Sequence, residues 1–273
     1  MKTSGSRILP LLIPCLFLQA SCQKPAQQQQ QKAEQGQVAQ TATPGVDSAQ
    51  PKSQEKRGNA PEATPVMVPA QPSGGQLVPL EIRLPNPMFV GTPTNIAVPN
   101  LEKPLGRPRQ PFLAPAGTRN VAFKKPVTGS DEQPVIGELS MVTDGDKEAA
   151  EGSFVELGPG VQYVTIDLKS RNTIYAIVVW HYHKQAVVYH DVIVQVADDK
   201  DFITNVQTLF NNDIDNSSGR GVGKDLSYVE TAEGKLIDAR GVQGRYIRLY
   251  SRGNTANDLN HYIEVEAYGK AVQ

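Results

Sequence analysis

Five stretches decide the fold of this chain: YVTIDL (163–168), IYAIVVWHY (174–182), HDVIVQVADD (190–199), RYIRLYS (245–251) and NHYIEVEAYG (260–269). Apolar and polar residues alternate in them, and clusters of Gly, Asn, Asp and Pro separate one stretch from the next. A repeat of two residues is that of a half-buried strand, and this turn spacing is typical of an antiparallel sandwich. We therefore expect an all-β fold, with strands near 120–127, 161–168, 173–182, 189–197, 205–210, 244–250 and 261–268.

The order of these pieces carries a family resemblance. Preceded by NVAFKKPVTGSD (120–131) and VTDGD (142–146), they resemble the discoidin family, also called the coagulation-factor C-type domain, and its bacterial relatives among the carbohydrate-binding modules. The resemblance covers residues 116–273 and implies a galactose-binding-like, jelly-roll type of antiparallel β-sandwich. Such domains bind ligands and do not usually transform them, so the resemblance implies a binding protein.

The net charge gives no indication of nucleic-acid binding, and the motif content gives none of catalysis. The formal net charge is −1 and no block of Lys and Arg occurs, so the chain has no electrostatic field to attract nucleic acid. No nucleophile elbow, Gly-rich phosphate loop or His-Glu-x-x-His motif occurs in the sequence. We expect a non-catalytic module that does not bind nucleic acid.

The first 21 residues read as a secretory signal that ends at a cysteine. A short basic start precedes the apolar run 8–18, which is too short to span a bilayer stably. The sequence QASC (19–22) resembles a bacterial lipobox, although Gln19 stands where an aliphatic residue is usual. This implies an exported lipoprotein of the cell envelope, anchored in a membrane by lipid on Cys22. The alternative is an ordinary cleaved signal.

Three further segments follow the signal. Residues 22–76 are rich in Gln, Pro, Ala, Ser and Thr and nearly free of large apolar residues, which predicts a disordered tether. Residues 77–115 combine apolar residues with frequent prolines, so we expect an extended segment that packs on the sandwich through Phe89 and Phe112. A plain linker is the alternative there. Residues 116–273 form the expected β-sandwich.

A candidate calcium site joins the turn VTDGD (142–146) to the last predicted strand. A Thr-Asp-Gly turn presents carboxylates and carbonyls together, which suits a hard cation such as calcium. The family resemblance implies Asp144 and Asp146 as turn ligands and Glu264 as the strand ligand. In the alternative, Asp144 only caps the turn and the glutamates face water.

A second polar loop, from Asp213 to Asp225, carries a weaker calcium pattern. Asp213, Asp215 and Ser217 have the alternating spacing of a calcium loop, but the glycine comes one residue late and Lys224 stands where the closing Glu is expected. A long polar turn has the same composition, so we interpret this loop mainly as a turn that could contact a ligand.

The predicted ligand face combines an aromatic ring with hydrogen-bonding side chains, because sugars offer apolar C–H faces and hydroxyl groups. His181 and His183 point the same way on a strand, so a zinc site completed by His190 or His261 is a remote alternative, and a simple polar rim is another. We thus expect a module that binds carbohydrate or another cell-surface polymer; the main alternative is a protein-binding adhesion or structural module stabilised by calcium. The candidate ligand residues are His181, Tyr182, His183, Arg252, Asn254, Asn260 and His261.

Overall fold

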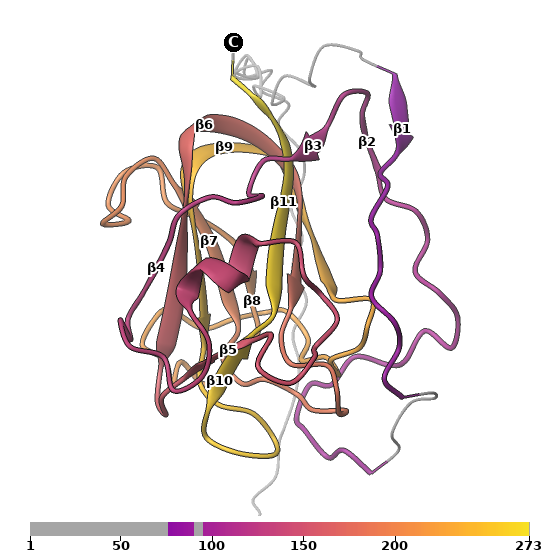
Figure 1. Cartoon of the computed structure of the whole chain (residues 1–273), viewed down its shortest axis with the longest axis vertical. Coiled ribbons are helices and arrows are strands. Elements are labelled where there is room, and N and C mark those ends of the chain that lie inside the picture. The colour runs from indigo at the N-terminus through magenta and orange to yellow at the C-terminus, as the bar shows by residue number, and fades with distance from the viewer. Residues whose placement is uncertain (1–75, 90–94, 273) are drawn as a thin grey trace, which may run out of the picture. The chain divides into compact units, whose positions relative to one another are not determined.

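A computed structural model describes residues 76–89 and 95–272. The predicted signal, Cys22 and the tether up to residue 75 lie outside the described residues. Within them the structure contains one short 3-10 helix, η1 (Leu139–Thr143), and is otherwise built from strands and loops (Figure 1). The strands are β1 (Leu77–Pro79), β2 (Leu113–Pro115), β3 (Arg119–Asn120), β4 (Val127–Gly129), β5 (Val155–Leu157), β6 (Gln162–Trp180), β7 (Ile193–Ala197), β8 (Gln207–Asn211), β9 (Lys235–Ser251), β10 (Asn260–Tyr262) and β11 (Glu264–Ala271).

Two long strands, β6 and β9, organise the fold. They pair antiparallel within a sheet of order β3-β11-β6-β9-β7-β8, and β4 also pairs with β6. The first half of β6 lies between β4 and the end of β9, whereas its second half lies between β11 and the start of β9. The register shifts between these halves, after Asp167, where both strands bend (Figure 1). The all-β antiparallel sandwich expected from the sequence is therefore confirmed.

The main hydrophobic core lies between the first and second halves of the bent strand β6. Val164, Ile166 and Leu168, which alternate in YVTIDL, are fully buried in it together with Ile174 and Ile177 of the second half. Ile174 and Ile177 are three positions apart because a second register shift follows Ile174. Such a bulge turns the next residues to the other face, so the shift allows both isoleucines to reach the same core.

The second half of β6 is buried on both faces. Ala176, Val178 and Trp180 form a second apolar cluster with Ile263 and Tyr268. This explains the nearly continuous apolar run IYAIVVW, because a strand covered on both sides has no position for water-facing residues.

The described parts of the Pro-rich segment, 76–89 and 95–115, contribute residues that cover this second cluster. β1 pairs with β2, and Leu80, Ile82 and Phe112 pack against the cluster. Farther along, the Lys235 ammonium donates to Glu102 Oε2 at 2.7 Å, and the Arg109 guanidinium donates to the Gly234 carbonyl at 2.9 Å. Phe89, the other expected anchor, is half-buried.

Several strand predictions need correction. The strands expected at 161–168 and 173–182 are one bent strand, and the first half of β9 lies outside the ranges named for strands. The strand expected at 120–127 is wrong in its middle. There the side chain of Asn120 accepts a hydrogen bond from the Ala122 N–H and Lys124 has a positive φ, so the chain turns between β3 and β4.

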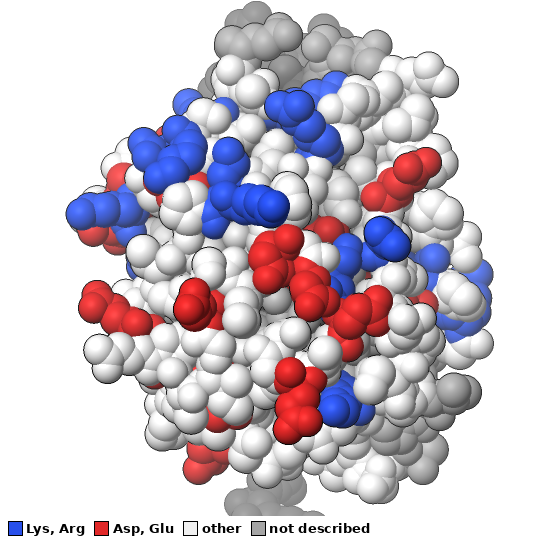
Figure 2. All heavy atoms as spheres, in the orientation of Figure 1, with Lys and Arg blue, Asp and Glu red and all other residues white. Residues whose placement is uncertain are grey.

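Charges of both signs are spread over the surface. On the face seen in Figure 2, basic side chains gather towards the upper left and acidic ones across the middle. No helix in the described ranges has the length and apolar character needed to span a membrane.

Candidate functional site

Two loops and two short strands meet at one end of the sandwich, and we call this end the crown. It consists of β5, the loop 181–190 after β6, the loop 252–259 after β9, and β10. The two long loops are held by backbone hydrogen bonds, from Thr255 N–H to the Val188 carbonyl (3.0 Å) and from His190 N–H to the Gly253 carbonyl (3.1 Å). β5 pairs with β10 through Glu156 opposite His261. Side chains at the crown therefore sit on braced backbone.

The crown contains a small pocket of about 200 Å3. Ligand pockets for drug-sized molecules measure about 300–1,000 Å3, so this one suits a single sugar ring or part of one. Its lining residues are Phe154, Glu156, Tyr182, Gln185, Val187, Tyr189, Asn254, Asn257 and His261.

A chain of hydrogen bonds forms the polar wall of the pocket. The Tyr189 hydroxyl lies 2.7 Å from His261 Nδ1, and His261 Nε2 lies 3.0 Å from Glu156 Oε2. Burial lowers the pKa of His261, and the hydrogen bond to Glu156 opposes this only in part. A neutral ring fits both contacts, because Tyr189 can donate to Nδ1 while Nε2–H donates to the carboxylate. Glu156 is thereby held in one orientation.

Aromatic rings form the apolar wall. The centroids of Phe154 and Tyr182 are 4.8 Å apart, and the His261 ring lies 5.9 Å from Phe154 and 5.7 Å from Tyr182. Phe154 and His261 are buried, whereas Tyr182 is half-buried. Tyr182 is thus the ring that offers surface to a ligand.

Three of the seven predicted ligand residues meet in this pocket: Tyr182, Asn254 and His261. Asn254 mainly shapes its own loop, because its amide donates to Asn257 Oδ1 (2.9 Å) and to the Leu259 carbonyl (3.0 Å). Asn257, exposed beside it, was not predicted.

His181 and His183 are placed differently from the expectation, because both are fully buried. His181 Nδ1 lies 2.6 Å from Glu230 Oε1 and the ring stacks on Tyr189 at 4.4 Å. His183 Nε2 instead contacts the Lys147 carbonyl at 2.9 Å. Neither ring is therefore accessible to a ligand at the surface. They also belong to no group with metal-ligand spacing in the described part of the chain, so the zinc alternative finds no ligand set there.

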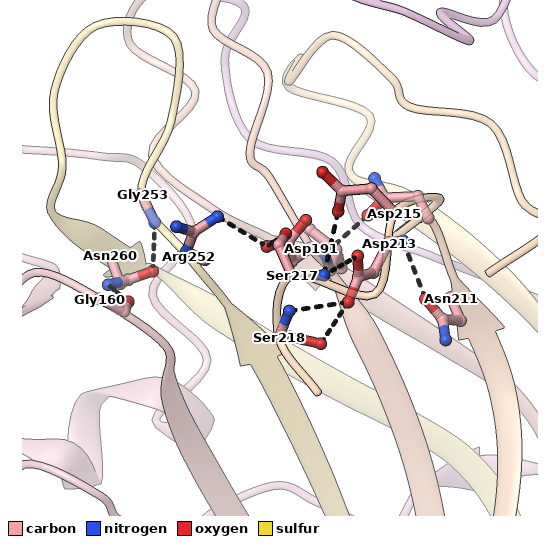
Figure 3. Close-up of polar contacts among 12 residues, drawn as sticks. Gly160, Asp191, Asn211, Asp213, Asp215, Ser217, Ser218, Arg252, Gly253 and Asn260 are labelled. Carbon is pink, nitrogen blue, oxygen red and sulfur yellow. Dashed lines mark hydrogen bonds and ion pairs between the residues drawn. The ribbon is translucent and has the colours of Figure 1, made fainter. Parts of the chain in front are cut away.

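Asn260 and Arg252 lie outside the pocket lining. Asn260 is buried and links two loops, accepting from the Gly253 N–H at 2.8 Å and donating to the Gly160 carbonyl at 3.1 Å (Figure 3). Arg252 is exposed and points to Asp191, 3.6 Å away (Figure 3). Asn260 therefore has a structural place, and Arg252 belongs to the neighbouring acidic loop.

That acidic loop brings together three carboxylates, of Asp191, Asp213 and Asp215, whose nearest oxygens lie within 4.8 Å of one another. Backbone and hydroxyl groups of Ser217 and Ser218 donate to them (Figure 3). Burial raises the pKa of Asp191. The sequence indicated Asp213 and Asp215 but not Asp191, which lies two residues before the start of β7. Serine donors account for the geometry of this loop as a tight polar turn.

The predicted calcium residues are brought near one another but do not form a close carboxylate set. Glu264 is fully buried; its Oε2 accepts from the Gly145 N–H at 3.1 Å, and its Oε1 has no hydrogen-bond partner. Burial raises the pKa of Glu264 to about 9. The exposed Asp144 and Asp146 cap the backbone N–H groups of Asp146 and Glu148. The alternative in which the glutamates face water is thus wrong for Glu264.

A larger hollow, of about 770 Å3, lies between β1, β2 and the outer face of β11. Its charged lining includes Glu81, Arg83 and Arg119, and its one aromatic residue, Tyr268, is 6% exposed and donates to Glu266. With no open ring surface, it lacks the aromatic platform that the crown pocket has.

Sequence reasoning missed six of the nine pocket residues: Phe154, Glu156, Gln185, Val187, Tyr189 and Asn257. Glu156 lies on β5, a strand of three residues that is too short to show alternation, and Phe154 lies just before it. Gln185 and Asn257 lie in loops with no motif. Proximity of Asn257 to the predicted Asn254 was the one available signal.

No family model and no curated protein sequence matches the chain. Solved structures with a similar fold include the CBM32 of AlyQ in complex with 4,5-unsaturated mannuronic acid (16% identity, 53% of this chain and 95% of that chain, TM-score 0.39). Another is chitosan-binding module 1 derived from a chitosanase/glucanase from Paenibacillus sp. IK-5 (19% identity, 55% and 99%, TM-score 0.38). A third is the Streptococcus pneumoniae fucose binding module SpX-3 (16% identity, 55% and 97%, TM-score 0.39).

These structures belong to the group of modules that the sequence resembles. At 16–19% identity the likeness extends to the fold alone.

Proposed function

We propose that this chain is a non-catalytic carbohydrate-binding module and that the crown pocket is its ligand site. One observation carries the proposal: the half-buried ring of Tyr182 stands in a braced pocket beside polar side chains, among them Gln185 and Asn257. A sugar ring stacks its C–H face on an aromatic surface while its hydroxyls bond to carboxylate and amide groups. The pocket supplies both kinds of group within the space of one ring.

The test is binding by the full chain to a glycan array, followed by titration with the best ligand. Tyr182→Ala removes the aromatic platform and should weaken binding by about 1–2 kcal/mol, roughly 5- to 30-fold. Tyr175→Ala is the matched control, because Tyr175 is also half-buried but does not line the pocket. Equal binding by both variants, with both folded by circular dichroism, would place the site elsewhere.

Calcium is proposed to stabilise the fold next to the crown. Glu264 would hold it, together with Asp144, Asp146 and carbonyls near Val142 and Ile263. The unpartnered buried Oε1 of Glu264 supports this, because a buried carboxylate oxygen without a donor or cation is costly. The nearby ammonium of Lys147 does not fill this role, since it lies 2.8 Å from Glu266 instead.

The module is also proposed to be exported and tethered to a membrane through lipid on Cys22. The support is the sequence alone: a signal-like start, small residues before the cysteine and a polar spacer up to residue 76. A tether of this composition would let the binding end sample polymers at a distance from the membrane.

A further inference from the structure

The crown pocket has an unbalanced charge. Its lining contains one carboxylate, that of Glu156, and neither Lys nor Arg; all nine lining residues are described by the structure. The nearby His261 does not balance this charge, because burial lowers its pKa and favours the neutral ring. A site of this charge repels uronic acids and other anionic sugars.

The carboxylate of Glu156 is oriented and still has a free oxygen. Its Oε2 accepts from His261, whose ring is held in turn by Tyr189. Its Oε1 makes no hydrogen bond to the described residues, and 13% of the side chain is exposed, within the pocket lining. A carboxylate with so little water and no counter-ion interacts strongly with a cation brought next to it.

The aromatic wall adds to the same preference. Phe154 and Tyr182 are in ring contact, with centroids 4.8 Å apart, and line the same pocket as Glu156. The faces of such rings attract ammonium groups, and partial desolvation strengthens that attraction. Carboxylate and rings together suit a small organic cation better than a neutral hydroxyl group.

We propose that the pocket selects a sugar that carries a free, protonated amine, with Glu156 as the residue that determines this specificity. The proposal rests on the proposed carbohydrate-binding function and specifies its ligand class. The ammonium donates to Glu156 Oε1, while the ring of the sugar lies against Tyr182. Acetylation of the amine removes both the charge and two of its donors, so an N-acetylated sugar loses this contact.

The experiment compares ligands that differ only in acetylation. Isothermal titration of the full chain with a glucosamine tetramer and with an N-acetylglucosamine tetramer should give a Kd at least about tenfold lower for the free amine, the size expected of one charge-assisted hydrogen bond. Glu156→Gln keeps the oxygen that accepts from His261 and should reduce this ratio to about one. Glu151→Gln, which removes an exposed carboxylate outside the pocket lining, should leave the ratio unchanged.

The outcomes separate this inference from the proposed function. If both tetramers bind the parent protein equally and Tyr182→Ala weakens both, the pocket binds sugar but the amine specificity is wrong. If a galacturonate oligomer binds more tightly than either, the specificity is also wrong. If no glycan binds, the proposed function fails as well. Should Glu156→Gln lower the melting temperature, the titration is run below that temperature, where the folded variant still tests Glu156.

Discussion

Gly234→Ala should destabilise the protein because it displaces Trp180. Gly234 ends a turn with φ +63°, and a Cβ atom there would lie 2.7 Å from Cε2 and Nε1 of Trp180. The indole is fully buried and its Nε1–H donates to the Ala232 carbonyl at 3.0 Å. It therefore cannot move without leaving a cavity or breaking that bond. Trp180 also ends β6, two residues before Tyr182 of the crown pocket.

The magnitude has two parts. A left-handed backbone costs an alanine about 1–2 kcal/mol relative to glycine, and forcing a methyl group into a filled core costs about 1–3 kcal/mol more. Gly106→Ala is the matched control, since Gly106 has the same φ of +63° but no atom within 4 Å of its added Cβ. We expect Gly106→Ala to lose about 1–2 kcal/mol and Gly234→Ala about 2–5 kcal/mol.

Urea unfolding followed by tryptophan fluorescence measures both variants, and the single Trp of the chain reports on the site itself. The slope of the unfolding free energy with urea should stay unchanged, so that the midpoint alone reports stability. Equal losses of stability in the two variants would refute the packing of Gly234 against Trp180.

Three further predictions concern the metal, the anchor and a surface ion pair. Chelation should lower the melting temperature, and excess calcium should restore it. At a calcium concentration of 100 times Kd, the free energy of unfolding should rise by about 3 kcal/mol. Glu264→Gln should abolish this response, and a parent protein whose stability does not depend on calcium would exclude the site. Cys22→Ala should move the protein from the membrane to the soluble fraction, whereas unchanged membrane retention would contradict lipidation. The hydrogen bond from Arg245 lowers the pKa of Asp167 from 3.8 to about 2, so the stability it contributes is present above pH 3.8 and is lost as the pH falls towards 2. The stability gap between the parent and Arg245→Ala should shrink over that interval, and a constant gap would show that the pair does not titrate in this way.

Strand identity could be read from the sequence for YVTIDL, where apolar and polar residues alternate strictly. In YVTIDL the alternation alone places Val164, Ile166 and Leu168 in the core, and the structure confirms it. Alternation was less informative in IYAIVVWHY, because a segment distant in the sequence covers its second face. The bend that joins two expected strands into β6 depends on register shifts against partners, which no local pattern records.

The crown shows the same difference between what residue type indicates and what the tertiary structure decides. Residue type alone identified Tyr182 and His261, because an aromatic ring and a hydrogen-bonding group suit a sugar. Only the tertiary structure separated them from His181 and His183, which have the same chemistry but are buried inside the sandwich. It also brought in Glu156, whose importance depends on its being the single charge in the pocket. The sequence by itself determined which chemical groups the chain carries, whereas the tertiary structure decided which of them share a surface, because burial and convergence depend on contacts between residues far apart in the chain.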